Sequence, residues 1–123
     1  MAQRTVLLLE DEPVIAADMH VLLLGLHCHV LRAADLAEAL ACCTLCAPDV
    51  VLLNFHPSDG TSSVLLAQTL QAFFSAKVIF VTGYRPQDLK TSSGVALPFP
   101  VLYKPFTRQQ FKAIVKEHIE IFS

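Results

Sequence analysis

Charged side chains are scarce in this sequence. Asp, Glu, Lys and Arg make up 16% of the residues and apolar types make up 54%, whereas soluble domains average roughly 25% and roughly 45–50%. The apolar excess predicts either strands that are buried on both faces or an adhesive surface.

Long apolar runs and sorting signals are also missing. Apolar stretches such as Val21–Leu24 and Val50–Leu53 fall far short of the roughly 18 residues that span a bilayer. The first residues lead directly into the strand-like Val6–Leu9 without an apolar targeting region. We therefore expect a cytoplasmic protein with no transmembrane segment.

A cluster of Lys or Arg is absent too, and the formal net charge is −2. The sequence thus lacks the electrostatic footprint of a protein that binds nucleic acid. The expected partner is another protein.

The four cysteines are Cys28, Cys42, Cys43 and Cys46. A disulfide framework is not expected in a chain without a secretion signal, and we interpret these residues as small apolar side chains. The Cys43-x-x-Cys46 spacing with histidines nearby leaves a zinc site as the alternative.

Apolar runs of strand length alternate with longer amphipathic stretches, which is typical of a parallel sheet covered by helices on both faces. A chain of 123 residues fits one domain, residues 1–123. The predicted strands are Thr5–Leu9, His29–Ala33, Val50–Leu53, Val78–Val81 and Val101–Tyr103. The predicted helices are Pro13–Leu26, Leu36–Leu45, Ser62–Phe74, Gln87–Lys90 and Arg108–Ile121, the last preceded by a capping box of Thr107 and Gln110.

Polar residues follow the predicted strands where ligands bind in doubly wound sheets. They are Glu10, Asp11, Asn54, Thr82 and Lys104. Adjacent carboxylates suit Mg²⁺, and a Lys with a hydroxyl suits the oxygens of a phosphoryl group. The set predicts phosphoryl chemistry, but it has no nucleophile at its centre.

Four motifs in order along the chain resemble those of response regulator receiver domains of bacterial two-component systems. They are Leu9-Glu10-Asp11-Glu12-Pro13, Asp49-Val50-Val51-Leu52-Leu53-Asn54, Val81-Thr82-Gly83 and Lys104-Pro105-Phe106. The resemblance implies a flavodoxin-like (βα)5 three-layer sandwich, with a parallel five-stranded sheet in the order 2-1-3-4-5, and a signalling module that is not an enzyme. Phe80-Val81-Thr82-Gly83-Tyr84 is similar to the Phe-x-Thr-Gly-Tyr type of stand-alone receiver.

The same resemblance implies a role for each polar residue. Glu10, Asp11 and the backbone carbonyl of His56 would bind Mg²⁺, while Thr82 and Lys104 would sense the phosphoryl group. It also implies a cis peptide bond between Lys104 and Pro105.

This sequence departs from the family at the phosphoacceptor, where Asn54 replaces the usual aspartate. A neutral carboxamide is a poor nucleophile, so we expect no phosphorylation by the usual route and weakened Mg²⁺ binding. Two origins fit: a natural pseudo-receiver, or an Asp→Asn change engineered to block phosphorylation.

A second departure concerns the aromatic residue that many receivers use as a switch, because Val101 occupies that position. A switch would have to use Tyr84 or Tyr103 instead.

Three further segments have open interpretations. We expect the His56 side chain to face solvent, and Asp59 to form a turn or a helix cap, with a surrogate phosphoacceptor as the alternative. The apolar stretch Val95–Val101 either lines the core or, as we favour, is partly exposed as a contact surface.

The sequence thus predicts a single-domain response regulator that acts by protein contact. Its expected partners are a sensor histidine kinase or another signalling protein, with a homodimer through the strand 5 region as a further expectation. The alternatives are a metal-dependent phosphate hydrolase that uses Asp11, and a receiver fragment of a larger kinase or regulator.

Overall fold

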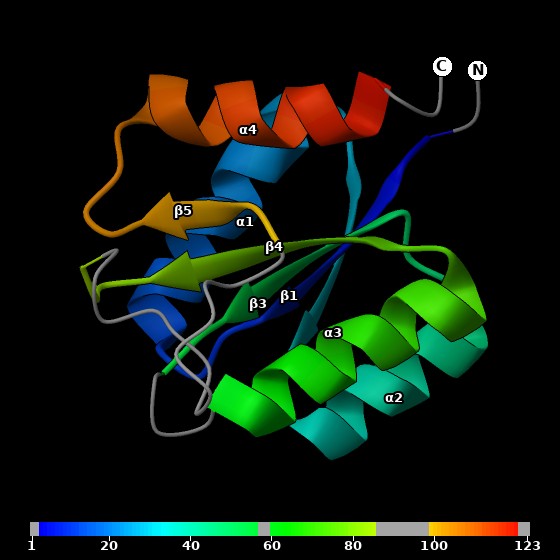
Figure 1. Cartoon of the computed structure of the whole chain (residues 1–123). Helices are drawn as coiled ribbons and strands as arrows, with labels where there is room; N and C mark the ends of the chain where they lie inside the picture. Colours follow the sequence, from blue (N-terminus) through cyan, green and yellow to red (C-terminus); the bar gives the residue numbers. More distant parts are fainter. Residues whose placement is uncertain (1–2, 57–59, 86–98, 121–123) are drawn as a thin grey trace.

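Five parallel strands form one sheet in the order β2-β1-β3-β4-β5, in a computed structural model that describes residues 3–56, 60–85 and 99–120. Helices α1 and α4 lie on one face of this sheet and α2 and α3 on the other (Figure 1). The predicted fold class and strand order are confirmed. The elements are β1 (Thr5–Leu9), α1 (Pro13–Gly25), β2 (His29–Ala33), α2 (Leu36–Leu45), β3 (Val50–Asn54), α3 (Gly60–Phe74), β4 (Lys77–Thr82), β5 (Val101–Tyr103) and α4 (Arg108–Glu120).

The predicted bounds agree with the structure for β1, β2, α2 and β5. β3 and β4 run further than predicted, because Asn54 pairs with Val81 and Thr82 pairs with Tyr103 in the sheet. α3 begins two residues earlier than predicted, at Gly60. The predicted helix Gln87–Lys90 lies outside the described residues.

The two faces of the sheet have separate apolar cores. In β1, Leu7 belongs to the core beneath α2 and α3, whereas Val6 and Leu8 belong to the core beneath α1 and α4. All five residues of β1 are buried, as are most residues of β3 and β4. The predicted burial of strands on both faces is confirmed for these three central strands.

Local sequence signals set the starts of two helices. At α4, the Thr107 hydroxyl accepts a hydrogen bond from the Gln110 N–H at 3.0 Å, and the Gln110 side chain accepts one from the Thr107 N–H at 2.8 Å. This is the predicted capping box. At α2, the Asp35 carboxylate accepts a hydrogen bond from the Glu38 N–H at 2.9 Å, which satisfies an otherwise unpaired donor.

Phe99 lines the core, so the favoured exposure of the stretch before β5 is wrong at this residue. Its side chain is 9% exposed and meets the Phe80 ring edge to face, with ring centroids 5.3 Å apart. Phe80 also packs on Phe55 at 5.0 Å, and together the three rings remove a large apolar area from water. Residues 95–98 lie outside the described part of the chain.

Two of the four cysteines are small side chains of the apolar core, as the sequence predicts. Cys28 and Cys43 are each 2% exposed, and burial raises the pKa of both thiols. Cys42 and Cys46 are half-buried, and all four thiols are free. Within the described residues, no group of three potential metal ligands includes a cysteine, so nothing there supports the zinc alternative.

We predict that Phe80→Ala lowers the free energy of unfolding by about 3–5 kcal/mol, because it leaves a cavity between the two neighbouring rings. Chemical denaturation would measure the change. The matched control is Phe73→Ala at the exposed end of α3, where the side chain is 78% exposed and the expected change stays within about 0.5 kcal/mol. Equal losses in the two variants would contradict the packing described above.

Candidate functional site at the carboxyl ends of the strands

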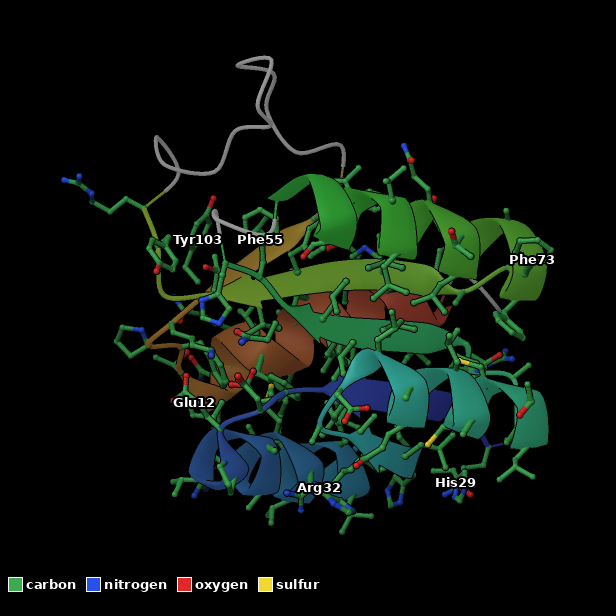
Figure 2. The ribbon with its side chains drawn as sticks, turned by 90° about the horizontal axis from the view of Figure 1, so that it is seen from below. Glu12, His29, Arg32, Phe55, Phe73 and Tyr103 are labelled. Carbon is green, nitrogen blue, oxygen red and sulfur yellow. The ribbon has the colours of Figure 1, made fainter. Side chains whose placement is uncertain are left out.

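Side chains from the ends of β1, β3 and β5 meet at one edge of the sheet. Figure 2 shows Glu12, Phe55 and Tyr103 at this end of the molecule, and His29 and Phe73 at the opposite end. The expected cluster of Glu10, Asp11, Asn54 and Lys104 does assemble here through side-chain hydrogen bonds.

Lys104 lies at the centre of this cluster. Its ammonium group donates hydrogen bonds to Glu10 Oε1 at 2.8 Å and to Asn54 Oδ1 at 3.2 Å. It also lies 3.7 Å from Glu12 Oε1. The side chain of Lys104 is 15% exposed and that of Glu10 only 1% exposed, so this ion pair is largely shielded from water.

The carboxamide of Asn54 is held in one orientation. An ammonium group has no acceptor, so Oδ1 must face Lys104 and Nδ2 must point the other way. There Nδ2 donates to Asp11 Oδ1 at 3.3 Å and lies 3.0 Å from His56 Nε2. Because Nδ2 is a donor, His56 Nε2 accepts and the proton of the neutral ring resides on Nδ1.

The His56 side chain is turned into the site, so the expectation that it faces solvent is wrong. Its ring is half-buried, contacts Asn54 and meets the Tyr84 ring edge to face, with centroids 6.1 Å apart. The amide of Asn54 offers a second donor that only a nearby acceptor can satisfy, which explains the inward position.

Thr82 is fully buried and its hydroxyl is engaged by the backbone. It donates to the Phe55 carbonyl at 2.9 Å and accepts from the Tyr84 N–H at 3.2 Å. In the described part of the chain the hydroxyl thus bonds to backbone groups that follow β3 and β4, and only the Thr82 carbonyl meets Lys104, by accepting from its N–H at 2.7 Å. Its role as a phosphoryl sensor stays a prediction.

The two candidate switch aromatics remain on the surface. Tyr84 is 45% exposed and Tyr103 is 37% exposed. Tyr84 contacts the His56 ring, so it is the better candidate for a switch that responds to the site. Asp59, the candidate surrogate acceptor, lies outside the described residues.

Three consecutive acidic residues could hold a divalent cation. Glu10, Asp11 and Glu12 each place one carboxylate oxygen within 4.8 Å of the others. The second oxygen of Glu10, Oε2, is buried and has no hydrogen-bond partner, and an unpaired buried oxygen of this kind is suited to a metal or a donor. The donor set therefore fits Mg²⁺, with Glu12 as a member that the sequence reasoning did not single out.

Desolvation dominates the electrostatics of Glu10. Burial raises the pKa of its carboxyl, and the hydrogen bond and positive charge of Lys104 offset this effect only in part. Two cavities open beside these residues. One of about 230 Å³ is lined by Glu10, Asp11, Arg32 and Glu38, among others; one of about 200 Å³ is lined by Asp11, Asn54, His56 and Ser63, among others.

Comparison with known proteins places this geometry in a family. The chain is 30% identical over 114 residues to the phyllosphere-induced regulator PhyR of Methylorubrum extorquens, covering 91% of this chain and 42% of that protein. The receiver domain of Erythrobacter litoralis PhyR superposes with a TM-score of 0.80 at 26% identity, covering 98% of this chain and 92% of that one. The chain is a response regulator receiver domain.

Other solved structures agree. PhyR of Brucella abortus matches with a TM-score of 0.79 at 27% identity, covering 98% of the receiver and 49% of that chain. No family model matches the sequence. The chain spans less than half the length of the curated relative that it matches, the PhyR of Methylorubrum extorquens.

Membership of this family bears on two general properties, the kind of activity and the metal. A receiver domain is a signalling module rather than a classical enzyme, so the hydrolase alternative with Asp11 as nucleophile is not retained. Receiver domains typically bind Mg²⁺, which agrees with the carboxylate set. Among the described residues, no helix is long and apolar enough to cross a membrane.

We predict that ionisation of Glu10 destabilises the metal-free protein. Because its pKa is raised on folding, the stabilising contribution is complete below the ordinary carboxyl pKa and is lost as the pH rises through the folded value. The free energy of unfolding of the wild type, relative to Glu10→Gln, should therefore fall from about pH 4 toward neutrality.

Denaturation at several pH values in the presence of a chelator would measure this difference. Glu12→Gln is the control, because the side chain it replaces is 56% exposed. A difference that stays constant or grows with pH would contradict the assigned environment of Glu10.

Proposed function

We propose that this receiver is a single-domain signalling module that acts by protein contact and is not phosphorylated at position 54. The observation that supports the proposal is the complete hydrogen bonding of the Asn54 carboxamide, to Lys104 through its oxygen and to Asp11 and His56 through its nitrogen. The Asn54 amide therefore has hydrogen-bond partners at both its oxygen and its nitrogen without a phosphoryl group.

A carboxylate would fit this arrangement poorly without a cation. An aspartate at position 54 would keep the contact with Lys104, but its second oxygen would lie near Asp11 Oδ1 and His56 Nε2, where Nδ2 now lies at 3.3 and 3.0 Å. The two carboxylates would repel each other unless a proton or a metal lies between them, whereas His56 would adopt its other tautomer and donate from Nε2. The amide instead donates to both neighbours.

The residues that would hold Mg²⁺ are Glu10, Asp11 and the backbone carbonyl of His56, with the carboxylate of Glu12 beside them. Bound there, the cation would supply positive charge against the acidic groups. Asn54 lowers the negative charge of the site by one and already engages Asp11 Oδ1. Both effects favour weak binding.

The proposed partners are a sensor histidine kinase or another signalling protein, in a cytoplasmic setting. A groove of about 500 Å³ between β5 and α4 supports a contact on that side, including the expected homodimer through the strand 5 region. Its lining residues are Val101, Leu102, Tyr103, Pro105, Gln110, Ala113, Ile114 and Glu117.

A second candidate is a receiver that works within a larger regulator. It is favoured by the share of the PhyR relatives that the chain covers, 42% and 49% in the two longer proteins. Under either proposal Asn54 silences the site, whether it is natural or an engineered replacement of aspartate.

We predict that acetyl phosphate with Mg²⁺ leaves the intact mass of the wild-type chain unchanged and adds one phosphoryl group to Asn54→Asp. The reason is that a carboxylate can form an acyl phosphate whereas a neutral amide is a poor nucleophile. Asn54→Asp combined with Lys104→Met is the control for chemistry that depends on the site. An adduct on the wild type would contradict the proposal, and Asp59→Asn would then test the surrogate acceptor.

We also predict that Asn54→Asp binds Mg²⁺ at least about tenfold more tightly than the wild type, because the variant adds one ligand charge. Thermal unfolding at increasing Mg²⁺ would measure both affinities, since a ligand that binds only the folded state raises its stability. Without Mg²⁺ the variant should be the less stable protein. Equal affinities would show that Asn54 does not limit metal binding.

A further inference from the structure

The cavity of about 230 Å³ beside the end of β1, here named the Glu10 cavity, contains an unsatisfied carboxylate oxygen. Glu10 lines this cavity and is only 5% exposed. Its Oε1 accepts a hydrogen bond from Lys104, whereas its Oε2 is buried and has no hydrogen-bond partner among the described residues. A buried oxygen without a donor costs free energy that a ligand with a donor group would recover.

The Glu10 cavity is distinct from the space around position 54. Asn54 and His56 line the second cavity, of about 200 Å³, and neither of them lines the Glu10 cavity. Asp11 and Ala34 border both cavities. Because the Glu10 cavity is also lined by Arg32, it extends toward the edge strand β2 and away from the phosphoacceptor position.

Arg32 supplies a positive group to the Glu10 cavity. It pairs with Leu8 in the sheet, and Leu8 belongs to the core beneath α1 and α4, so the Arg32 side chain extends from the same face of the sheet. Figure 2 shows Arg32 at the border of the molecule where α1 lies. Within the described part of the chain, no hydrogen bond or ion pair engages its guanidinium group.

The spacing of the two unsatisfied groups suits a small zwitterion. Glu10 is two residues beyond Leu8, the sheet partner of Arg32, so the α-carbons of Glu10 and Arg32 lie roughly 8 Å apart across neighbouring strands. A guanidinium group pairs with a carboxylate, and a carboxylate oxygen accepts from an ammonium group. An α-amino acid carries both complementary groups on one carbon, whereas a single ion would satisfy only one side.

The rest of the wall limits the size and polarity of the ligand. A space of about 230 Å³ is smaller than the roughly 300–1,000 Å³ of a site for drug-sized molecules. Apart from the carboxylates of Asp11 and Glu38, the remaining lining is apolar and mostly small: Leu8, Pro13, Ala16, Ala33 and Ala34. This lining suits a short aliphatic side chain, and the two additional carboxylates favour a cationic group in the ligand.

We propose that the Glu10 cavity binds a small aliphatic α-amino acid. The ammonium group of the ligand donates to Glu10 Oε2, and its carboxylate accepts from the guanidinium group of Arg32. A ligand of so few atoms in an open cavity gives a Kd on the order of 1 mM. The proposal is separate from the proposed function, because Asn54 does not line this cavity, and either can fail alone.

Titration of the isotope-labelled full chain with L-alanine, followed by NMR, tests the site. A chelator is present so that no divalent cation competes for Glu10. The amide signals of Ala33 and Ala34 should shift and saturate below about 20 mM. Ethylamine and propionate each keep one of the two charged groups, and each should bind at least about tenfold more weakly, because a charge-assisted hydrogen bond is lost.

Arg32→Gln tests the carboxylate end of the ligand. This variant should weaken the binding of L-alanine by about tenfold or more and leave that of ethylamine unchanged, since ethylamine has no group for the guanidinium. Arg108→Gln is the matched control, because Arg108 is exposed and lines neither cavity, and its affinity for L-alanine should equal that of the wild type. The amide spectra without ligand verify that both variants fold.

Three results would overturn the proposal. The first is the absence of saturable shifts with L-alanine at any concentration up to about 20 mM. The second is an affinity for propionate or ethylamine equal to that for L-alanine, which would show a site for a single ion. The third is an equal loss of L-alanine binding in Arg32→Gln and Arg108→Gln, or no loss in Arg32→Gln.

Discussion

The ion pair between Lys104 and the buried carboxylate of Glu10 is the interaction on which the site depends. A carboxylate that is almost fully removed from water needs a countercharge, and Lys104, which follows the edge strand β5, supplies it at 2.8 Å. The same ammonium group fixes the oxygen of Asn54 at 3.2 Å. The ammonium group of Lys104 therefore neutralises the Glu10 carboxylate that follows β1 and also fixes the orientation of the Asn54 amide at the end of β3.

The orientation of that amide decides what the rest of the site can do. With its nitrogen toward Asp11 and His56, Asn54 donates to one oxygen of the first and to the ring nitrogen of the second. A carboxylate at position 54 could not donate to Asp11 and would add a negative charge beside it. Asn54 thus affects more than nucleophilicity, because it also places a hydrogen-bond donor beside Asp11 and His56.

The sequence was sufficient for the fold, since apolar runs such as those of β1 and β3 report burial on both faces directly. It also predicted which strand ends carry polar groups. It was wrong about His56 and Phe99, and it did not single out Glu12, for a common reason. Phe99 and Glu12 depend on partners distant in the chain, the ring of Phe80 and the ammonium of Lys104. His56 depends on the orientation of its near neighbour Asn54, which Lys104 fixes from 50 residues further along the chain. Periodicity along the chain contains no record of such contacts.

The scarcity of charge, the first feature of the sequence, has two different structural origins. One is the central sheet, in which strands buried on both faces have no place for charged residues. The other is α1, whose outer positions are apolar although the fold leaves them in water. Composition alone cannot separate these origins, because a buried Val and an exposed Val count equally. The distinction matters for function: the first origin stabilises the domain, whereas the second leaves an apolar surface that association can remove from water.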